Sequence, residues 1–270
     1  MVAATIARSI ATPARAPFIA LDGVAKTYEA RFGGQVQAVE TVSFEIGHGE
    51  FVSIVGPSGC GKTTLLKMIG GLLEPSAGKI TYQGLAPGRK KPQLGIVFQD
   101  AVLLPWRTVL QNVCLPIEVM RKDKAQGEAL ARRLIELVGL KGFEDKYPTE
   151  LSGGMQQRAS IARALVSDPA ILLMDEPFGA LDALTREYMA QELQRIWSSA
   201  AKTVLFITHS ITEAVFLSDR VVVMTARPSR VAEIIPIDLP RPRDLQMTTS
   251  EVFGRQVAHI RSLLSATGEL

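Results

Sequence analysis

The chain has 270 residues, enough for one large domain or a core with a subdomain. A net charge of +3, spread over short basic clusters, does not favour a nucleic-acid surface, and no stretch approaches the roughly 20 apolar residues of a membrane span. Two cysteines, Cys60 and Cys114, make no disulfide framework, which is typical of a reduced cytosolic protein.

The first part of the chain combines a polar extension with short strands. Residues 1–17 lack the apolar core of a secretory signal, so we expect a disordered extension. Residues 18–21 form a short apolar run, and apolar residues alternate with polar ones within residues 39–46; both patterns predict strands. Tyr28 lies between these runs. Its ring either packs as an ordinary aromatic or stacks on a nucleotide base.

Residues 56–63 read Gly-Pro-Ser-Gly-Cys-Gly-Lys-Thr and fit the phosphate-binding P-loop pattern G-x-x-x-x-G-K-[ST]. A strand-like apolar run precedes the loop and a helical pattern follows it, as the motif requires. The glycines allow a tight turn whose N–H groups point at phosphate oxygens, and the helix N-terminus adds partial positive charge. We expect Lys62 to reach the β- and γ-phosphates and Thr63 to help hold Mg²⁺.

Strand and helix patterns alternate through the rest of the chain. Strand patterns lie at 79–82, 94–98, 170–174, 203–208 and 220–224, and helical patterns at 112–120, 127–138, 183–197 and 211–217. This alternation predicts a largely parallel sheet covered by helices, with a helical insertion at about 100–158. Ligands bind beyond the carboxyl ends of such strands, where the P-loop, Gln99, Asp175, Glu176 and His209 all fall.

Two polar groupings point to chemistry at this edge. Asp175 and Glu176 are adjacent carboxylates after a buried strand; one can hold Mg²⁺ while the other polarises an attacking water. Residues 151–158, Leu-Ser-Gly-Gly-Met-Gln-Gln-Arg, open a helix whose free backbone amides form a second anion-binding end. Alone, the Asp175-Glu176 pair would be an ordinary turn, and the Ser-Gly-Gly helix start would be an ordinary N-cap. Beside a complete P-loop, both favour nucleotide chemistry.

Together these segments resemble the ATP-binding subunit of an ABC transporter, from about residue 18 to 240. The resemblance implies an α/β fold: a P-loop NTPase (RecA-like) core with an antiparallel β edge subdomain and an inserted α-helical subdomain. It also implies an ATPase domain over residues 18–243, followed by a helical tail at 244–270. The expected reaction is ATP hydrolysis, with Mg²⁺ as the metal.

The resemblance implies a role for each matching residue. Expected ATP contacts are Tyr28, now as the base-stacking aromatic, and Gly56, Pro57, Ser58, Gly59, Cys60, Gly61, Lys62, Thr63 and Thr64. Expected catalytic residues are Lys62, Gln99, Glu176 and His209, with Thr63, Gln99 and Asp175 at the metal. Residues 180–182 match the D-loop, with Asp182 as its aspartate. The signature residues, expected to act in trans on ATP held by a second subunit, are Ser152, Gly153, Gly154 and Gln156.

The expected partners follow from the same resemblance. It implies a head-to-tail homodimer with ATP at the interface, peripheral on the cytoplasmic face of the inner membrane. Separate ABC permease subunits would bind this dimer, a solute-binding protein would be an indirect partner, and nucleic acid would not be one. Residues 104–109 and 239–243 look like importer ATPases for nitrate, alkanesulfonates and taurine. Relatives serving pyrimidine precursors or bicarbonate share much of this pattern.

Alternative readings remain for one segment and for the whole chain. Leu104 and Trp106 either pack inside the helical subdomain or line a groove that receives a short permease helix. A superfamily member acting on DNA or ribosomes is disfavoured, because the short distance from Gln99 to Ser152 leaves no room for a long coiled coil and only one ATPase unit is present. A small-molecule P-loop kinase would not need the Ser-Gly-Gly helix start.

Overall fold

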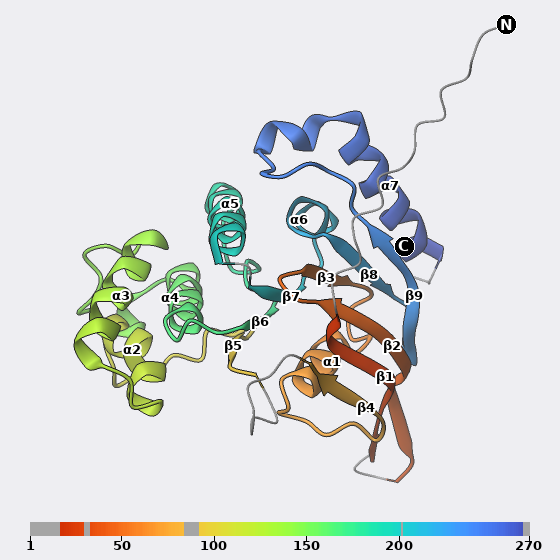
Figure 1. Cartoon of the computed structure of the whole chain (residues 1–270), viewed down its shortest axis with the longest axis horizontal. Helices are drawn as coiled ribbons and strands as arrows, with labels where there is room; N and C mark the ends of the chain where they lie inside the picture. Colours follow the sequence, from red (N-terminus) through yellow and green to blue (C-terminus); the bar gives the residue numbers. More distant parts are fainter. Residues whose placement is uncertain (1–16, 30–32, 84–91, 201, 267–270) are drawn as a thin grey trace, which may run out of the picture.

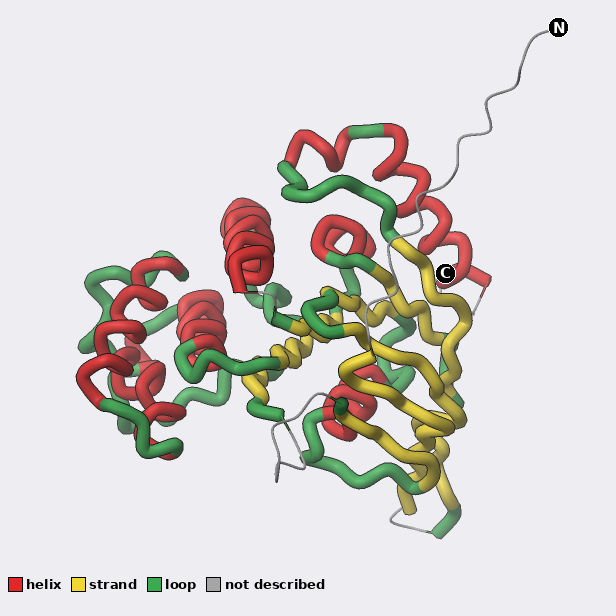
Figure 2. The backbone as a smooth tube through the Cα atoms, viewed as in Figure 1, coloured by secondary structure: helices red, strands yellow, loops and turns green. Residues whose placement is uncertain are grey.

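The computed structural model describes residues 17–29, 33–83, 92–200 and 202–266. Within these ranges, nine strands form one sheet in the order β4-β1-β2-β9-β8-β3-β7-β6-β5. The sheet curls so that its β1, β2 and β4 end lies beside α1 (Figure 2). The predicted extension at residues 1–17 lies outside the described residues except for Pro17, which begins β1.

The elements follow the predicted alternation of strands and helices. The strands are β1 Pro17–Glu29, β2 Gln35–Gly47, β3 Phe51–Val55, β4 Ala77–Tyr82, β5 Leu94–Val97, β6 Ile171–Asp175, β7 Thr203–Ile207, β8 Arg220–Met224 and β9 Ser229–Pro236. The α-helices are α1 Lys62–Ile69, α2 Val109–Val119, α3 Lys124–Leu137, α4 Gly153–Leu165, α5 Ala183–Ala200, α6 Ile211–Leu217 and α7 Glu251–Ala266. Strand β9 was not predicted, and β1 continues past the predicted residues 18–21 to include Tyr28.

The centre of the sheet is parallel and its edge is antiparallel, as predicted. Strands β8, β3, β7, β6 and β5 pair in parallel. Strand β1 pairs antiparallel with both β2 and β4. Strand β9 joins the two parts, because it pairs antiparallel with β8 and parallel with β2. The P-loop follows β3, which lies between β8 and β7 in the parallel region.

Each face of the central strands covers a separate hydrophobic cluster. In β7, Val204 and Phe206 face the cluster that includes residues of α2 to α7, whereas Leu205 and Ile207 face the cluster formed with α1 and β1. This alternation is the period of two that a strand imposes on its side chains. Because both faces are covered, the central strands are continuously apolar, and their carboxyl ends are the places where polar side chains emerge.

Helices α2, α3 and α4 form a group at one end of the molecule, on the left in Figure 1. The loop before α2 is fixed by Asn112, whose buried amide donates to the carbonyls of Leu104 and Arg107 and accepts from the Leu104 N–H at 2.7 Å. Thr108 caps the helix, accepting a hydrogen bond from the Gln111 amide. This loop therefore has a defined conformation although its side chains reach the surface.

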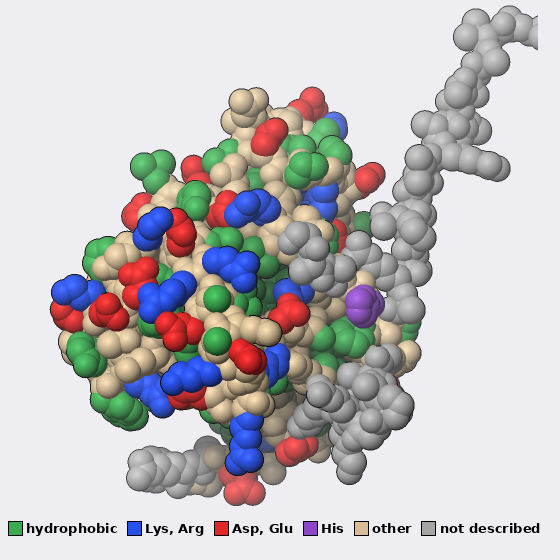
Figure 3. Space-filling model, turned by 60° about the vertical axis from the view of Figure 1, so that its left-hand side comes forward, with side chains coloured by type: hydrophobic (Ala, Val, Ile, Leu, Met, Phe, Trp, Pro, Cys, Tyr) green, Lys and Arg blue, Asp and Glu red, His purple; other side chains and the backbone are tan. Residues whose placement is uncertain are grey.

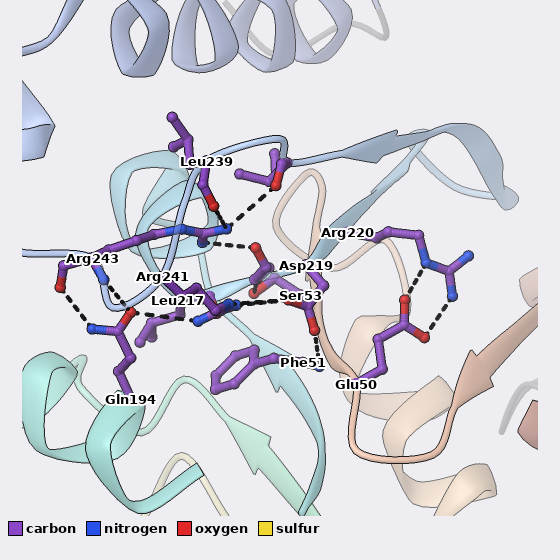
Figure 4. A network of polar contacts seen from close by, with 12 residues as sticks. Glu50, Phe51, Ser53, Gln194, Leu217, Asp219, Arg220, Leu239, Arg241 and Arg243 are labelled. Atoms are coloured by element: carbon purple, nitrogen blue, oxygen red, sulfur yellow. Dashed lines mark hydrogen bonds and ion pairs between the residues drawn. The ribbon is translucent and has the colours of Figure 1, made fainter. Parts of the chain in front are cut away.

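The C-terminal segment packs back onto the core through two arginines, Arg241 and Arg243 (Figure 4). Arg243, which is 3% exposed, donates to the carbonyls of Val215, Phe216 and Ser218 at the end of α6. Arg241 pairs with Asp219 and lies over the Trp197 ring. The predicted helical tail contains α7, which buries Phe253 and Ile260. Across the described ranges, no helix combines the length and apolar content needed to cross a bilayer.

Candidate functional site

The P-loop is a tight connection whose glycines are required by its surroundings. Gly59 and Gly61 have φ of +72° and +109°, values that L-residues with side chains rarely adopt. A Cβ on Gly56 would lie 3.0 Å from the Met224 Cβ, and one on Gly61 would lie 3.0 Å from the Ala38 carbonyl oxygen. The loop is therefore wedged between β8 and β2, and the N-terminus of α1 opens directly from it.

Lys62 and Thr63, the last two residues of the motif, point into this connection. The Lys62 ammonium is largely buried and donates to the carbonyl oxygens of Gly56 and Pro57 at 2.6 and 2.8 Å. The Thr63 hydroxyl is hydrogen-bonded to the Asp175 carboxylate. Burial raises the pKa of Asp175 above its ordinary value; the bond from Thr63 offsets part of the rise, and the neighbouring Glu176 adds to it.

Three predicted residues meet at one carboxylate oxygen. Gln99 follows β5 and donates from its amide to Glu176 Oε2 at 3.4 Å. His209 follows β7, and its Nδ1 lies 3.3 Å from the same oxygen. Glu176 itself follows β6 with φ of +47°. Because these strands are parallel neighbours, their carboxyl ends deliver the three side chains to one edge of the sheet, together with Asp175.

Tyr28 lies at the side of this site. Its hydroxyl oxygen is 3.5 Å from Thr64 Oγ1 in the first turn of α1, and the Lys26 ammonium lies over its ring at 5.4 Å from the centroid. The side chain is 40% exposed, so its ring is not an interior packing residue. The ordinary-packing alternative does not fit this exposure, whereas an aromatic face next to the P-loop helix fits base stacking.

The signature residues are placed away from the P-loop of the same chain, since α4 lies with α2 and α3 (Figure 1). Ser152 caps α4 by accepting from the Met155 amide, and Gln156 donates to the carbonyl of Pro148 at 3.0 Å. Ser152 and Gly153 are exposed. A Cβ on Gly154 would lie 3.2 Å from the Ala180 carbonyl oxygen, so the signature packs on the D-loop.

The D-loop leads into α5. Asp182 accepts from the Thr185 amide at 3.0 Å and so caps this helix. Hydrogen bonds from the hydroxyl and the amide of Thr185 hold the pKa of Asp182 below its ordinary value.

A partly buried polar chain that the sequence did not single out connects the D-loop with His209. Arg186 on α5 donates to the D-loop carbonyl of Leu181 at 3.1 Å, and its Nε lies 3.6 Å from Glu213 on α6. Glu213 accepts from the Thr208 hydroxyl at 2.6 Å, next to His209. Burial raises the pKa of Glu213, opposed by the Thr208 bond and by Arg186. The available sequence signal was a carboxylate, Glu213, only four residues after His209 and within the first turn of α6.

The loop before α2 exposes apolar side chains. Trp106 is 70% exposed and Val102 is 61% exposed, and Val119 and Met120 at the end of α2 are 74% and 40% exposed. Leu104 is partly buried. Figure 3, in which this side of the molecule comes forward, shows hydrophobic side chains among interspersed basic and acidic ones. Interior packing does not account for Trp106, while its docking role stays a prediction.

Comparison with known proteins identifies the same family that the sequence resembles. The ABC transporter family matches residues 39–179, just over half of the chain. An uncharacterized ABC transporter ATP-binding protein of Methanocaldococcus jannaschii is 51% identical over 224 residues, 83% of this chain and 84% of that protein. A taurine import ATP-binding protein of Rhizobium johnstonii is 45% identical over 257 residues, 93% and 97% of the two chains.

Two further matches extend this likeness. A nitrate import ATP-binding protein of Synechococcus elongatus is 46% identical over 229 residues, which are 84% of this chain and 35% of that longer protein. A solved dimeric ATP-binding cassette in a post-hydrolysis state, bound to ADP and Pi, has a TM-score of 0.73 and 32% identity, covering 82% of this chain and 100% of that one. The chain therefore belongs to the ABC transporter family, as an ATP-binding and ATP-hydrolysing subunit.

Proposed function

We propose that this subunit hydrolyses ATP as a head-to-tail homodimer and thereby drives import of a small solute through separate permease subunits. The observation that carries the proposal is the convergence of Gln99 and His209 on the Glu176 carboxylate, beside the P-loop helix. The named importers among its relatives support a solute such as taurine, nitrate or an alkanesulfonate. They also support a peripheral place on the cytoplasmic face of the inner membrane.

The residues fit the parts of a phosphoryl-transfer site. Lys62 and the P-loop amides bind and orient the phosphates, so their negative charge is neutralised before reaction. Glu176 polarises the attacking water, and His209 contacts the γ-phosphate from the next strand. Each acts by position and charge, which is most of what in-line phosphoryl transfer requires.

The same edge fits a magnesium ion. The hydroxyl of Thr63 and the carboxylate of Asp175 are already paired, and Gln99 adds an amide oxygen within reach of the same edge. These are the hard oxygen donors that Mg²⁺ prefers. When bound, the ion would neutralise charge on the β- and γ-phosphates. Asp175 would hold the ion and Thr63 would orient it. Gln99 would couple binding of the ion to the position of the adjoining helical subdomain.

The signature supports the dimer. Ser152 and Gly153 are exposed at a helix N-terminus that lies away from the chain's own P-loop, so a second copy can supply its nucleotide. In this arrangement each ATP is held by the P-loop of one subunit and covered by the signature of its partner. We further propose that a solute-binding protein is an indirect partner through the permease.

The test is identification and reconstitution of the permease. The tagged subunit is used to purify its membrane partner from the source cells, and the complex is placed in proteoliposomes with ATP inside, on the side of the subunit. We expect ATP-dependent uptake of one of the three solutes in the presence of its binding protein. Association with DNA or ribosomes in place of a membrane protein would contradict the proposal, as would hydrolysis without uptake of any of these solutes.

A further inference from the structure

The turn between β8 and β9 borders the P-loop along its length. Met224, at the end of β8, lies against Gly56, and Ser229, at the start of β9, would be 3.4 Å from a Cβ on Gly61. Between them, Arg227 donates from Nη2 to the carbonyl oxygen of Gly59 at 2.5 Å. The turn, far from the P-loop in sequence, thus contacts each of its three glycines.

The bond from Arg227 fixes one peptide of the P-loop. In a trans peptide, the Gly59 C=O and the Cys60 N–H point in opposite directions. The Cys60 N–H is directed at the Pro57 carbonyl oxygen, at 3.2 Å, which is the same oxygen that Lys62 binds. The Gly59 carbonyl therefore faces Arg227 outside the loop, while the Cys60 amide faces the interior of the loop, where the Lys62 ammonium also lies.

This peptide needs such a restraint. Gly59 has φ of +72° and no side chain, so its backbone is free to rotate away from a conformation that other residues avoid. A guanidinium bond to a carbonyl is charge-assisted and stronger than a neutral one. Arg227 itself is exposed, and its guanidinium contacts the loop at the Gly59 carbonyl oxygen.

We propose that Arg227 is a positioning residue for nucleotide binding, which holds the Gly59–Cys60 peptide so that the Cys60 N–H faces the phosphates. The inference rests on ATP binding by the P-loop. It assigns a role in that binding to a residue near the C-terminal end of the ATPase domain in sequence. P-loop amides cradle the α- and β-phosphates, which ATP and ADP share. Arg227 therefore supports both nucleotides equally and acts on affinity rather than on hydrolysis.

The test compares Arg227→Ala and Arg227→Lys with the wild-type protein, by calorimetric titration with Mg-ATP and Mg-ADP in low and high salt. Arg230→Ala is the matched control, since this neighbouring exposed arginine pairs with Glu40 at 3.2 Å. We expect Arg227→Ala to raise Kd about three- to tenfold for both nucleotides, the loss of one exposed charge-assisted bond. KM should rise in parallel, kcat at saturating ATP should not change, and the nucleotide-free Tm should stay within about 2 °C.

Hydrogen exchange in the nucleotide-free protein supplies a second readout, and the P-loop peptide should exchange faster in Arg227→Ala. An unchanged Kd for Arg227→Ala, or an equal rise for Arg230→Ala, would overturn the inference. The inference would also be overturned if Arg227→Lys bound nucleotide like the wild type and the rise in Kd of Arg227→Ala disappeared in 0.5 M salt. Arg227 would then act only as a positive charge that salt screens. Absence of ATP binding by the wild-type protein would instead refute the proposed function and the inference with it.

Discussion

Glu176 is held in a conformation that costs the backbone energy. Its φ of +47° is uncommon for a residue with a side chain, and strain of this kind persists where surrounding bonds impose it. Here the Glu176 amide donates to the Ile207 carbonyl at 2.9 Å, so the chain turns out of β6 while still attached to β7. The turn aims the carboxylate at Gln99 and His209.

Replacing this carboxylate should separate binding from hydrolysis. Glu176→Gln keeps the size of the side chain but removes the group that polarises water, so hydrolysis should fall at least a hundredfold, roughly the share of a general base. ATP should then persist between two subunits, and the variant should elute as a dimer with ATP but not with ADP in gel filtration. Lys62→Ala, by contrast, should lose nucleotide binding and dimerisation together. Normal turnover by Glu176→Gln would remove this residue from its role.

Tyr28 should contribute to nucleotide affinity with little discrimination among the bases. Its exposed ring offers a stacking face, which contributes about 1–3 kcal/mol per base and tolerates all bases. Tyr28→Ala should therefore weaken binding of ATP, GTP and CTP alike, and Tyr28→Trp should preserve it, as measured by nucleotide titration. A strong adenine preference that survives in Tyr28→Ala would show that another residue recognises the base.

The residues predicted from sequence are those that directly follow a strand or belong to a local motif. Gln99 and His209 each come within two residues of a strand end, and chain order alone places them at one edge of the sheet. Arg227 follows no such rule, because its partner is a backbone carbonyl far away in sequence, and backbone groups leave no pattern in the residue string. Arg186 and Glu213 were missed for a related reason, since a pair on two helices depends on how those helices pack.

At the scale of elements, α6 is fixed at both ends. Ser210, the residue after His209, caps the start of this helix, because its hydroxyl accepts a hydrogen bond from the Glu213 amide. Arg243 closes its other end, where helix carbonyls lack partners within the helix. Burial lowers the pKa of Arg243 to about 9, so it remains protonated at neutral pH. The C-terminal segment thereby anchors the helix that follows His209.

Arg243→Met should show what this anchor contributes. Methionine fills much of the space but leaves several buried carbonyls unsatisfied, and the free energy of unfolding should fall by about 2–4 kcal/mol. Chemical denaturation measures the change. Arg255→Ala on α7 is the control, since its pair with Glu251 is exposed and should contribute little. Equal stability of Arg243→Met and wild type would show that the arginine merely fills space.

Prediction of elements succeeded where a helical period or a continuous apolar run was intact. The bounds of α6 and β8 are those expected, and α5 is longer by three residues. In β1 the register shifts after Leu21 and again after Val24, and such bulges break the alternation that marks a strand. Strand β9 was missed because it is stabilised by pairing with β2 and β8, and β2 lies far away in sequence.

At the scale of the molecule, the nucleotide edge and the exposed loop are joined by a short path. Gln99 contacts Glu176 at the sheet edge, and the chain then runs directly into the loop that carries Trp106. Asn112 locks this loop onto α2, so movement of the loop and of the helical group are coupled. A partner bound at Trp106 would therefore be connected mechanically with the Gln99–Glu176 contact at the sheet edge.

Trp106→Ala tests whether the permease binds there. Since the side chain is 70% exposed, its loss should cost less than about 1 kcal/mol of stability, as for most surface changes. Basal ATPase of the isolated subunit should stay near normal, while recovery of the permease in a pull-down should fall severely. Val252→Ala, an exposed apolar residue on α7, is the matched control and should assemble normally. A stability loss of 3–5 kcal/mol would assign Trp106 to packing, and undiminished assembly of Trp106→Ala would place the docking surface elsewhere.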